Sequence, residues 1–327
     1  MDAPVIFLTH TPAMRRNYYG EQALAGLRQL GTVRLHEGAA PLDAAQLVAA
    51  AADAQVIVAD RATAGPASVF AGLPRLLTFM RVAVDISTID VPAASTAGVL
   101  VTRAGPGFVS SVVELVLGLM VDLARGVSTA AAQYRAGGVP VASMGRQLAG
   151  STLGIIGYGS IGRHLAPLGT ALGMNVLVAD PYTAVDAPFR PVSLDALLRQ
   201  ADFVVCLAVA SAETENLMNA AAFAQMRPDA FFINVSRGGL VDEAALEAAL
   251  REGRLAGAAL DVGRAPDQMP TPRLAALPNV VATPHVGGLT PPAIEAQALE
   301  TVDQLRALLR GEVPRGAVNP ETWRNRP

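Results

Sequence analysis

The sequence predicts an α/β fold that is built from parallel βαβ units and divided into two domains. Short apolar runs alternate with amphipathic segments of helix length from one end of the chain to the other, which is typical of such units. The chain has 327 residues, about twice the ~150 of a usual domain. A cluster of helix breakers at residues 103–108 separates two series of elements, and it predicts a domain junction.

The first series contains five predicted strands and the second contains six. In the first, strands are expected at Val5–Leu8, Val33–Leu35, Val56–Ala59, Leu76–Met80 and Val99–Thr102, with helices at Glu21–Leu30 and Asp43–Ala52. One long helix, Val109–Tyr134, is expected after the junction. The second series has expected strands at Thr152–Gly157, Val176–Asp180, Phe203–Val209, Ala230–Val235, Gly257–Val262 and Val280–Thr283.

Helices alternate with the six strands of the second series, at Ile161–Leu172, Leu194–Gln200, Ala220–Met226 and Glu243–Glu252. Such regular alternation predicts a doubly wound, dinucleotide-binding sheet. A final helix, Ala293–Leu309, is expected to precede a mobile tail rich in proline and arginine.

Composition excludes several classes of function. All 25 basic residues are arginine, and the net charge is −3. Without lysine there is no Schiff base and no phosphate-binding lysine, and this charge balance favours neither nucleic acid nor a membrane as a partner. Cys206 is the single cysteine, so neither a disulfide nor a cysteine-based metal site is expected. The amino terminus lacks a signal-peptide pattern and Val112–Ala124 is too short to span a membrane, so we expect a cytoplasmic protein.

A glycine-rich segment follows the first strand of the second series. Its residues are Gly157, Tyr158, Gly159, Ser160, Ile161 and Gly162. In this G-x-G-x-x-G pattern the glycines allow a tight turn, close approach of a pyrophosphate and close helix packing, while the helix amino end faces the phosphates. Asp180 ends the next strand, where a carboxylate holds ribose hydroxyls and repels a 2′-phosphate. The pattern predicts a dinucleotide site that prefers NAD to NADP.

Three further polar residues, Arg237, Asp261 and His285, lie at expected carboxyl ends of strands. Ligands of open α/β sheets bind at that edge. Arginine is always charged and its planar fork suits a carboxylate, whereas histidine titrates near neutral pH. A solvated loop arginine and a packed core histidine are the alternatives, but Pro284 before His285 and two glycines after it predict a special bend in place of a continuing strand.

Together with the glycine-rich segment, these residues closely resemble the NAD-dependent D-isomer-specific 2-hydroxyacid dehydrogenase family. The resemblance implies a Rossmann cofactor domain, residues 104–290, inserted in a split flavodoxin-like substrate domain, residues 1–103 and 291–327. It implies that Arg237 binds the carboxylate and carbonyl of a 2-oxo acid, that His285 is the acid and base, and that Asp261 holds the nicotinamide end of the cofactor. It also implies a homodimer.

Two segments depart from the family pattern. The family places a Glu, which pairs with the catalytic His, five residues after the position of Asp261. Here Pro266 stands at that position and Asp267 follows it. Asp267 is therefore the candidate partner of His285, with Gln268 as the alternative. The second departure is in the amino-terminal half, where a Gly-x-Gly loop is replaced by a segment containing Arg81, Val82 and Ala83. These residues are candidate substrate contacts, and for Arg81 a solvent-facing position is favoured.

The resulting prediction is an oxidoreductase that transfers a hydride between NAD(H) and a small 2-hydroxy or 2-oxo acid. Two alternatives stay open. One is an NAD(H)-sensing, corepressor-like binding protein, because the position of the family Glu is altered. The other is a dehydrogenase of the formate or phosphite type.

Overall fold

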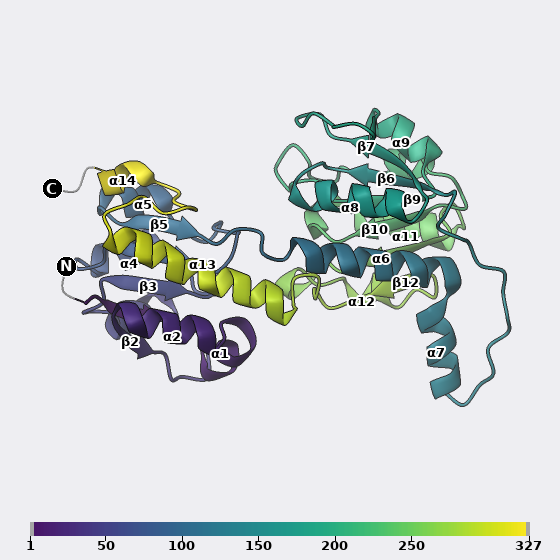
Figure 1. Ribbon diagram of the computed structural model, residues 1–327. Coiled ribbons are helices and arrows are strands. Elements are labelled where there is room, and N and C mark those ends of the chain that lie inside the picture. Colours follow the sequence, from purple (N-terminus) through teal and green to yellow (C-terminus); the bar gives the residue numbers. More distant parts are fainter. Residues whose placement is uncertain (1–2, 325–327) are drawn as a thin grey trace. The chain divides into compact units, whose positions relative to one another are not determined.

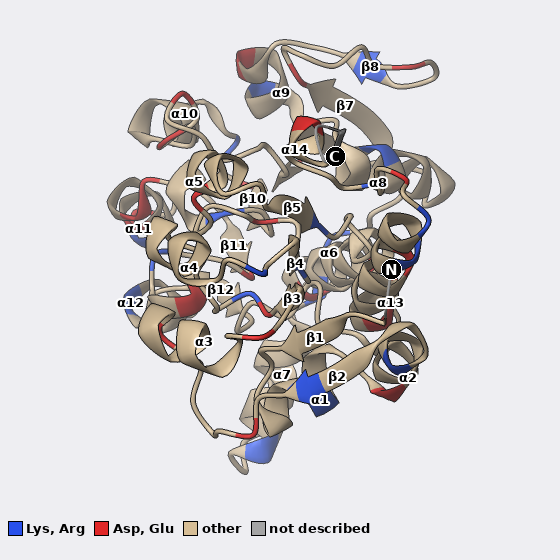
Figure 2. Ribbon diagram, turned by 90° about the vertical axis from the view of Figure 1, so that its left-hand side faces the viewer, with Lys and Arg blue, Asp and Glu red and all other residues tan. Residues whose placement is uncertain are grey.

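The computed structural model describes residues 3–324 and divides the chain into two compact units. Unit 1 consists of Met1–Phe108 and Pro291–Pro327, and unit 2 is Val109–Thr290. The first boundary thus follows Phe108, where the sequence suggested Arg103, and the second lies after Thr290. Basic and acidic residues are interspersed along the ribbons of both units (Figure 2).

Unit 1 is built on a parallel sheet with the strand order β2-β1-β3-β4-β5 over the described residues. Strands β1 and β3 are continuous apolar runs because helices cover both faces of the sheet. This is the flavodoxin-like order. The strands are β1 (Val5–Leu8), β2 (Thr32–Leu35), β3 (Val56–Ala59), β4 (Thr78–Arg81) and β5 (Leu100–Arg103). The helices are α1 (Pro12–Tyr18), α2 (Glu21–Leu30), α3 (Ala44–Ala50), α4 (Ala67–Gly72), α5 (Val91–Thr96), α13 (Pro291–Leu309) and α14 (Pro320–Arg324).

Unit 2 contains a second parallel sheet, with the order β12-β11-β10-β9-β6-β7-β8 over the described residues. The order reverses between β6 and β9, which is the switch point where ligands bind in doubly wound sheets. The strands are β6 (Thr152–Ile156), β7 (Asn175–Ala179), β8 (Arg190–Pro191), β9 (Phe203–Cys206), β10 (Phe231–Asn234), β11 (Gly257–Leu260) and β12 (Val280–Ala282). The helices are α6 (Val109–Arg125), α7 (Val127–Arg135), α8 (Ser160–Ala171), α9 (Leu194–Gln200), α10 (Ala220–Gln225), α11 (Glu243–Arg251) and α12 (Pro272–Ala275).

The predicted fold class, two doubly wound parallel-sheet domains, is confirmed. The six strands predicted for the second series are all present, and the short edge strand β8 joins them. The single helix predicted at Val109–Tyr134 was wrong: Gly126, at φ +64°, separates α6 from α7, and the two helices are bent by 70°. In residues 3–324 no single helix is long and apolar enough to cross a membrane, although α6 and α7 taken together meet that length and composition.

The carboxyl-terminal tail was predicted to be mobile, and this was wrong for its described part. Asn319 accepts a hydrogen bond from the main-chain N–H of Val101 (2.7 Å) and donates one to the carbonyl of Val99 (3.0 Å). Arg103 and Gly316 are also joined through their main chains. The tail is therefore fixed along β5, and α14 follows it.

Candidate active site

The glycine-rich turn between β6 and α8 can be formed only by glycines at two positions. Gly157 has φ +97°, and a Cβ on it would lie 2.8 Å from the main chain of Leu207 and Ala208. A Cβ on Gly162 would lie 2.4 Å from the carbonyl of Gly157. Gly159, by contrast, has nothing within 4 Å of such a position. The turn is therefore tight on its inner side and open where a pyrophosphate would approach the amino end of α8.

The carboxylate of Asp180 is part of the same turn. Its Oδ2 accepts a hydrogen bond from the Tyr158 N–H (2.6 Å), and its Oδ1 accepts from the N–H groups of Tyr182 (2.8 Å) and Thr183 (2.9 Å). Burial raises the pKa of Asp180, but these main-chain donors outweigh it and hold the pKa below the ordinary value. The Thr183 hydroxyl is a fourth donor to this carboxylate, and a carboxylate accepts about four hydrogen bonds, so a ribose hydroxyl would take the place of one of them. The turn and Asp180 together fit a dinucleotide.

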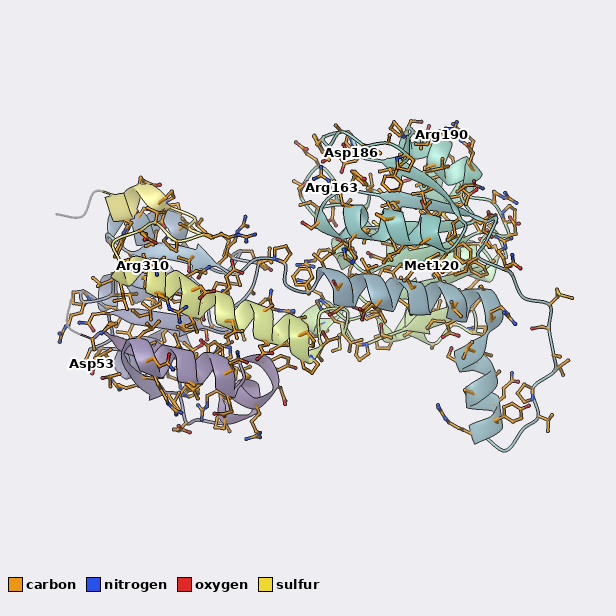
Figure 3. The ribbon with its side chains drawn as sticks, viewed as in Figure 1. Asp53, Met120, Arg163, Asp186, Arg190 and Arg310 are labelled. Atoms are coloured by element: carbon orange, nitrogen blue, oxygen red, sulfur yellow. The ribbon has the colours of Figure 1, made fainter. Side chains whose placement is uncertain are left out.

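Tyr158 turns its side chain into the protein. Its buried ring meets Phe189 edge-on, with centroids 6.2 Å apart, and the guanidinium carbon of Arg163 lies 5.4 Å from its centre. Burial raises the pKa of Tyr158, and the nearby Asp186 carboxylate raises it further. Arg163 and Asp186 lie on the same side of unit 2 (Figure 3). The side chain of Tyr158 is therefore packed inside the protein, and its predicted contact with a cofactor, which only its main chain could make, stays a prediction.

Arg237 is held at the carboxyl end of β10 by Asn234. The buried Asn234 side chain donates to the carbonyl of Arg237 (3.0 Å) and accepts from the N–H of Ser236 (3.1 Å). Arg237 itself is half-buried and begins a short 3₁₀ turn, Gly238–Leu240. A Cβ on Gly238 would lie 2.1 Å from the carbonyl oxygen of Gly263. The turn that carries Arg237 is therefore pressed against the turn that follows β11.

Asp261, at the end of β11, organises the segment that carries His285. Its Oδ1 accepts from the Thr283 hydroxyl (2.7 Å) and the Val286 N–H (2.8 Å), and its Oδ2 accepts from the Gly287 N–H (2.8 Å). Asp261 is only 1% exposed. These three bonds bend the chain around His285, which has φ +55°. In this structure Asp261 thus positions a histidine loop, and the contact with nicotinamide stays a prediction.

The imidazole of His285 contacts Asp267, but through the main chain. Its Nδ1 lies 2.9 Å from the carbonyl oxygen of Asp267. A carbonyl oxygen only accepts hydrogen bonds, so Nδ1 carries the hydrogen and Nε2 is left to exchange a proton. The predicted pairing with the carboxylate of Asp267 is not what orients the ring, because Asp267, at φ +57°, is exposed and presents its carbonyl. The alternative, Gln268, has a buried Oε1 without a hydrogen-bond partner among the described residues.

The solvent-facing position favoured for Arg81 was wrong. Arg81 is fully buried at the end of β4 and donates hydrogen bonds to the carbonyls of Asp60 and Thr63 and to the hydroxyl of Thr88. Burial lowers the pKa of Arg81 to about 10, although the Asp60 and Asp85 carboxylates oppose this. Its charge therefore supports the loops of unit 1. The next two residues, Val82 and Ala83, are also buried, and their predicted contact with substrate stays a prediction.

The neighbours of Arg81 form a polar cluster that the sequence analysis missed. Thr9 and Thr63 donate their hydroxyls to the Asp60 carboxylate (2.5 and 2.6 Å), and His10 is buried next to them. Burial raises the pKa of Asp60, but these hydroxyls, His10 and the Ala62 N–H bring it below the ordinary value. The sequence did contain a signal for this cluster, because Thr9 and Asp60 are polar residues that each directly follow an apolar strand.

Comparison with known proteins places unit 2 in a family. Residues 117–287 match the family model described as D-isomer specific 2-hydroxyacid dehydrogenase, NAD binding domain. The chain is 35% identical over 273 residues to an (S)-sulfolactate dehydrogenase from Chromohalobacter salexigens, covering 82% of this chain and 88% of that protein. It is 34% identical over 305 residues to a D-3-phosphoglycerate dehydrogenase from Methanocaldococcus jannaschii, covering 91% of this chain and 57% of that protein.

A solved structure extends the match to both units. The crystal structure of TT0316 protein from Thermus thermophilus has a TM-score of 0.86 and 32% identity, and the match covers 96% of this chain and 99% of that one. The chain spans a little over half the length of the D-3-phosphoglycerate dehydrogenases that it matches. The family model, the similar sequences and the solved structure lead to the same conclusion: the chain belongs to the D-isomer specific 2-hydroxyacid dehydrogenase family, and unit 2 carries its NAD-binding domain.

Proposed function

We propose that the protein is an NAD(H)-dependent oxidoreductase that interconverts a small 2-hydroxy acid and its 2-oxo acid. The observation that carries this proposal is the state of His285: its Nδ1 is held by a main-chain carbonyl, so Nε2 is the proton-exchanging atom. Arg237 and His285 both follow strands of the sheet whose switch point carries the cofactor turn. NAD, when bound, accepts or supplies the hydride.

The proposed chemistry divides between two side chains. Arg237 binds the carboxylate of the substrate and polarises its carbonyl, because a guanidinium offers several donors in one plane. In the oxidation direction, Nε2 of His285 takes the hydroxyl proton as the hydride leaves C2 and the C=O bond forms. In the reduction direction, Nε2 returns that proton to the carbonyl oxygen. The main-chain N–H of Val82 donates to the carbonyl of Ala59 (3.0 Å), so we do not propose it as a contact of the substrate carboxylate.

The names of the relatives guide the choice of substrate. Phosphoglycerate and sulfolactate each carry a second anionic group beyond the carboxylate. The test is a panel of 2-oxo acids, in which the loss of NADH absorbance measures reduction. Glyoxylate, pyruvate, hydroxypyruvate and phenylpyruvate lack a second anionic group, whereas 3-sulfopyruvate and 3-phosphohydroxypyruvate carry one. Formate and phosphite, with NAD, test the remaining type of dehydrogenase.

Arg237→Lys and His285→Ala test the roles of the two side chains on the best substrate of that panel. An ammonium cannot reproduce a two-point contact with carboxylate and carbonyl, so the lysine variant is expected to lose at least roughly tenfold in kcat/KM while its Kd for NADH stays within about twofold. Wild-type kcat/KM in this variant would show that Arg237 is not the substrate anchor.

A second candidate function is an NAD(H)-sensing binding protein. It is favoured by one observation, namely that a main-chain carbonyl and not a carboxylate holds His285. Tight binding of NADH without turnover on any member of the panel would support the sensor and contradict the oxidoreductase.

We also propose that the protein is a homodimer that forms through α7 and the segment after it. Helix α7 buries none of its residues, and Val139, Val141 and Met144 are 84%, 90% and 99% exposed. The helix and segment project away from the rest of unit 2 (Figure 1), yet the segment ends at Arg146, which is fixed by ion pairs with Asp202 and Asp229. An apolar arm of this kind is typical of an interface.

Light scattering after gel filtration measures the mass in solution. The unmodified chain is expected to elute as a dimer, and the double variant Val141→Asp, Met144→Asp as a monomer. A monomeric unmodified chain would contradict the proposal.

A further inference from the structure

Arg264 lies in the loop after β11, between Asp261 and Asp267, and joins three loops at the carboxyl edge of the sheet of unit 2. The two N–H groups of its Nη2 are shared among Glu215 Oε1 (2.7 Å), Asn216 Oδ1 (2.6 Å) and the carbonyl of Gly239 (3.1 Å). Its Nε donates to the carbonyl of Val241 (3.2 Å). The acceptors come from the loop after β9 and from the turn after β10.

The loop after β9 and the turn after β10, which both accept hydrogen bonds from Arg264, are also hydrogen-bonded to each other through their main chains. The N–H of Asn216, which has φ +53°, donates to the carbonyl of Gly239 (2.8 Å), and the N–H of Met218 donates to the carbonyl of Leu240 (2.9 Å). The side chain of Arg264, which comes from the loop after β11, donates hydrogen bonds to both segments. Its guanidinium and the N–H of Asn216 meet on the same carbonyl, that of Gly239, two residues after Arg237.

The loop of Arg264 also reaches His285. It runs from Gly263, whose N–H donates to the carbonyl of Gln268 (2.8 Å), through Asp267, whose carbonyl accepts from His285. The N–H of Arg264 donates to Glu243 Oε1 (3.0 Å), which ties the loop to the start of α11. One side chain therefore connects the loop that orients the proposed acid and base to the turn that presents the proposed carboxylate anchor.

We propose that Arg264 is a positioning residue that fixes Arg237 relative to His285; this inference rests on the proposed function. Its own ion pair with Glu215 is on the surface, with side chains 39% and 50% exposed, and surface pairs contribute little to folding stability. The acceptors that it gathers include main-chain carbonyls of the turn that carries Arg237, so its removal affects the geometry of that turn more than the stability of the fold. If Arg237 is displaced, both substrate binding and turnover are weakened, because a small displacement of the reacting groups lowers the rate strongly.

The first experiment measures the turn without any assay of activity. Hydrogen–deuterium exchange of peptides covering residues 213–218 and 236–242 is compared between the unmodified protein and Arg264→Met. We expect these peptides to exchange at least roughly tenfold faster in the variant, with unchanged exchange in β6 and β9. Unchanged exchange in the 236–242 peptide would overturn the proposal, whatever the protein catalyses.

The second experiment uses the 2-oxo acid that the panel identifies. Arg264→Met is expected to lower kcat/KM at least roughly tenfold and Arg264→Lys to recover only part of this loss, while Kd for NADH stays within about twofold. Arg254→Met is the matched control, because Arg254 forms a surface ion pair of the same length (2.7 Å) with Glu252 away from this edge; its kcat/KM is expected to be unchanged.

Reversal of the charges makes the test specific. Arg264→Glu places a carboxylate beside Glu215 and is expected to be the most damaging single change, whereas Arg264→Glu combined with Glu215→Arg restores the attraction and is expected to recover at least part of kcat/KM. Wild-type kinetics in Arg264→Met would overturn the proposal. A lack of turnover in the unmodified protein would instead contradict the proposed function, and the exchange experiment would still decide the role of Arg264 in holding the turn.

Discussion

His285 and Asp267 are joined through a main-chain carbonyl: the imidazole Nδ1 lies 2.9 Å from the carbonyl oxygen of Asp267, and the carboxylate of Asp267 is exposed. A carbonyl fixes the tautomer and direction of the ring without adding a formal charge. Backbone conformation sets the orientation of the ring, because Asp267, Gln268 and His285 all have positive φ angles. Such backbone geometry is maintained only where the surrounding structure holds it.

The first prediction concerns Asp267→Asn. Asparagine tolerates a positive φ and keeps the carbonyl, so the alkaline limb of kcat/KM for reduction is expected to stay within about 0.3 pH units of the wild-type position. His285→Ala is the contrasting variant, and it is expected to lose on the order of 10²-fold or more in turnover at every pH. A downward shift of the limb by about one unit in Asp267→Asn would show that the carboxylate, and not the carbonyl, supports the histidine.

Much of the fold was predictable because buried parallel strands leave a simple signal. Strands β3 and β9 are uninterrupted apolar runs, buried along their whole length. Strand β8 was missed because its two residues, Arg190 and Pro191, are exposed and pair with β7 at the sheet edge. The break at Gly126 was missed because an isolated glycine inside an apolar helical pattern does not by itself mark an end.

Candidate site residues could be proposed from the sequence where the residue type and its place after a strand carry a signal, as for Gly157, Asp180, Arg237 and His285, and their roles stay predictions. The partner of His285 was not, because every residue has a carbonyl and no side-chain pattern reveals which one is used. The burial of Arg81 was hidden for the same reason, since its acceptors include main-chain carbonyls of Asp60 and Thr63. Arg264 went unnoticed because its role depends on three loops that are distant in sequence.

The second prediction concerns the cofactor. NADH is expected to bind at least roughly tenfold more tightly than NADPH, because the ionised Asp180 repels a 2′-phosphate. Asp180→Asn is expected to narrow this preference, chiefly by weakening NADH, since the same carboxylate also fixes the Tyr158 N–H. Fluorescence titration measures both affinities. Asp195→Asn is the control, because this exposed carboxylate on α9 accepts a hydrogen bond from Gln225 and bonds no group of the glycine-rich turn; equal affinities of the unmodified protein for the two cofactors would contradict the argument.

The third prediction concerns the stability of unit 1. Arg81→Met removes the donors that satisfy the carbonyls of Asp60 and Thr63, and it leaves the Asp60 carboxylate without its nearby cation. We expect a loss of about 2–4 kcal/mol in the free energy of unfolding, measured in urea. Arg75→Met, at an exposed position of the same unit, is expected to change it by less than about 0.5 kcal/mol. Equal effects of the two substitutions would mean that the buried cluster contributes nothing specific.

The last prediction concerns the acid sensitivity of unit 1, which depends on His10. The ring is 1% exposed, packs against Tyr19 at a centroid distance of 5.1 Å, and has no hydrogen-bond partner for Nδ1 among the described residues. Burial lowers the pKa of His10 from 6.5 to about 4; the Asp60 carboxylate opposes this, and Arg15 and Arg81 add to it. His10 is therefore neutral in the native protein.

The sign of the effect follows from proton binding. Between pH 4 and 6.5 the unfolded chain binds a proton at His10 that the folded chain does not, so this contribution to stability is complete above about pH 6.5 and is lost as the pH falls toward 4. A shift of this size corresponds to a loss of about 2 kcal/mol at about pH 5 relative to about pH 7.5. His10→Phe keeps an aromatic ring against Tyr19 and removes the titrating group. Urea unfolding at the two pH values is expected to show a pH-dependent loss that is smaller in His10→Phe by about that amount. If both proteins lose the same free energy between these two pH values, His10 does not titrate on unfolding in this range and other groups set the acid sensitivity.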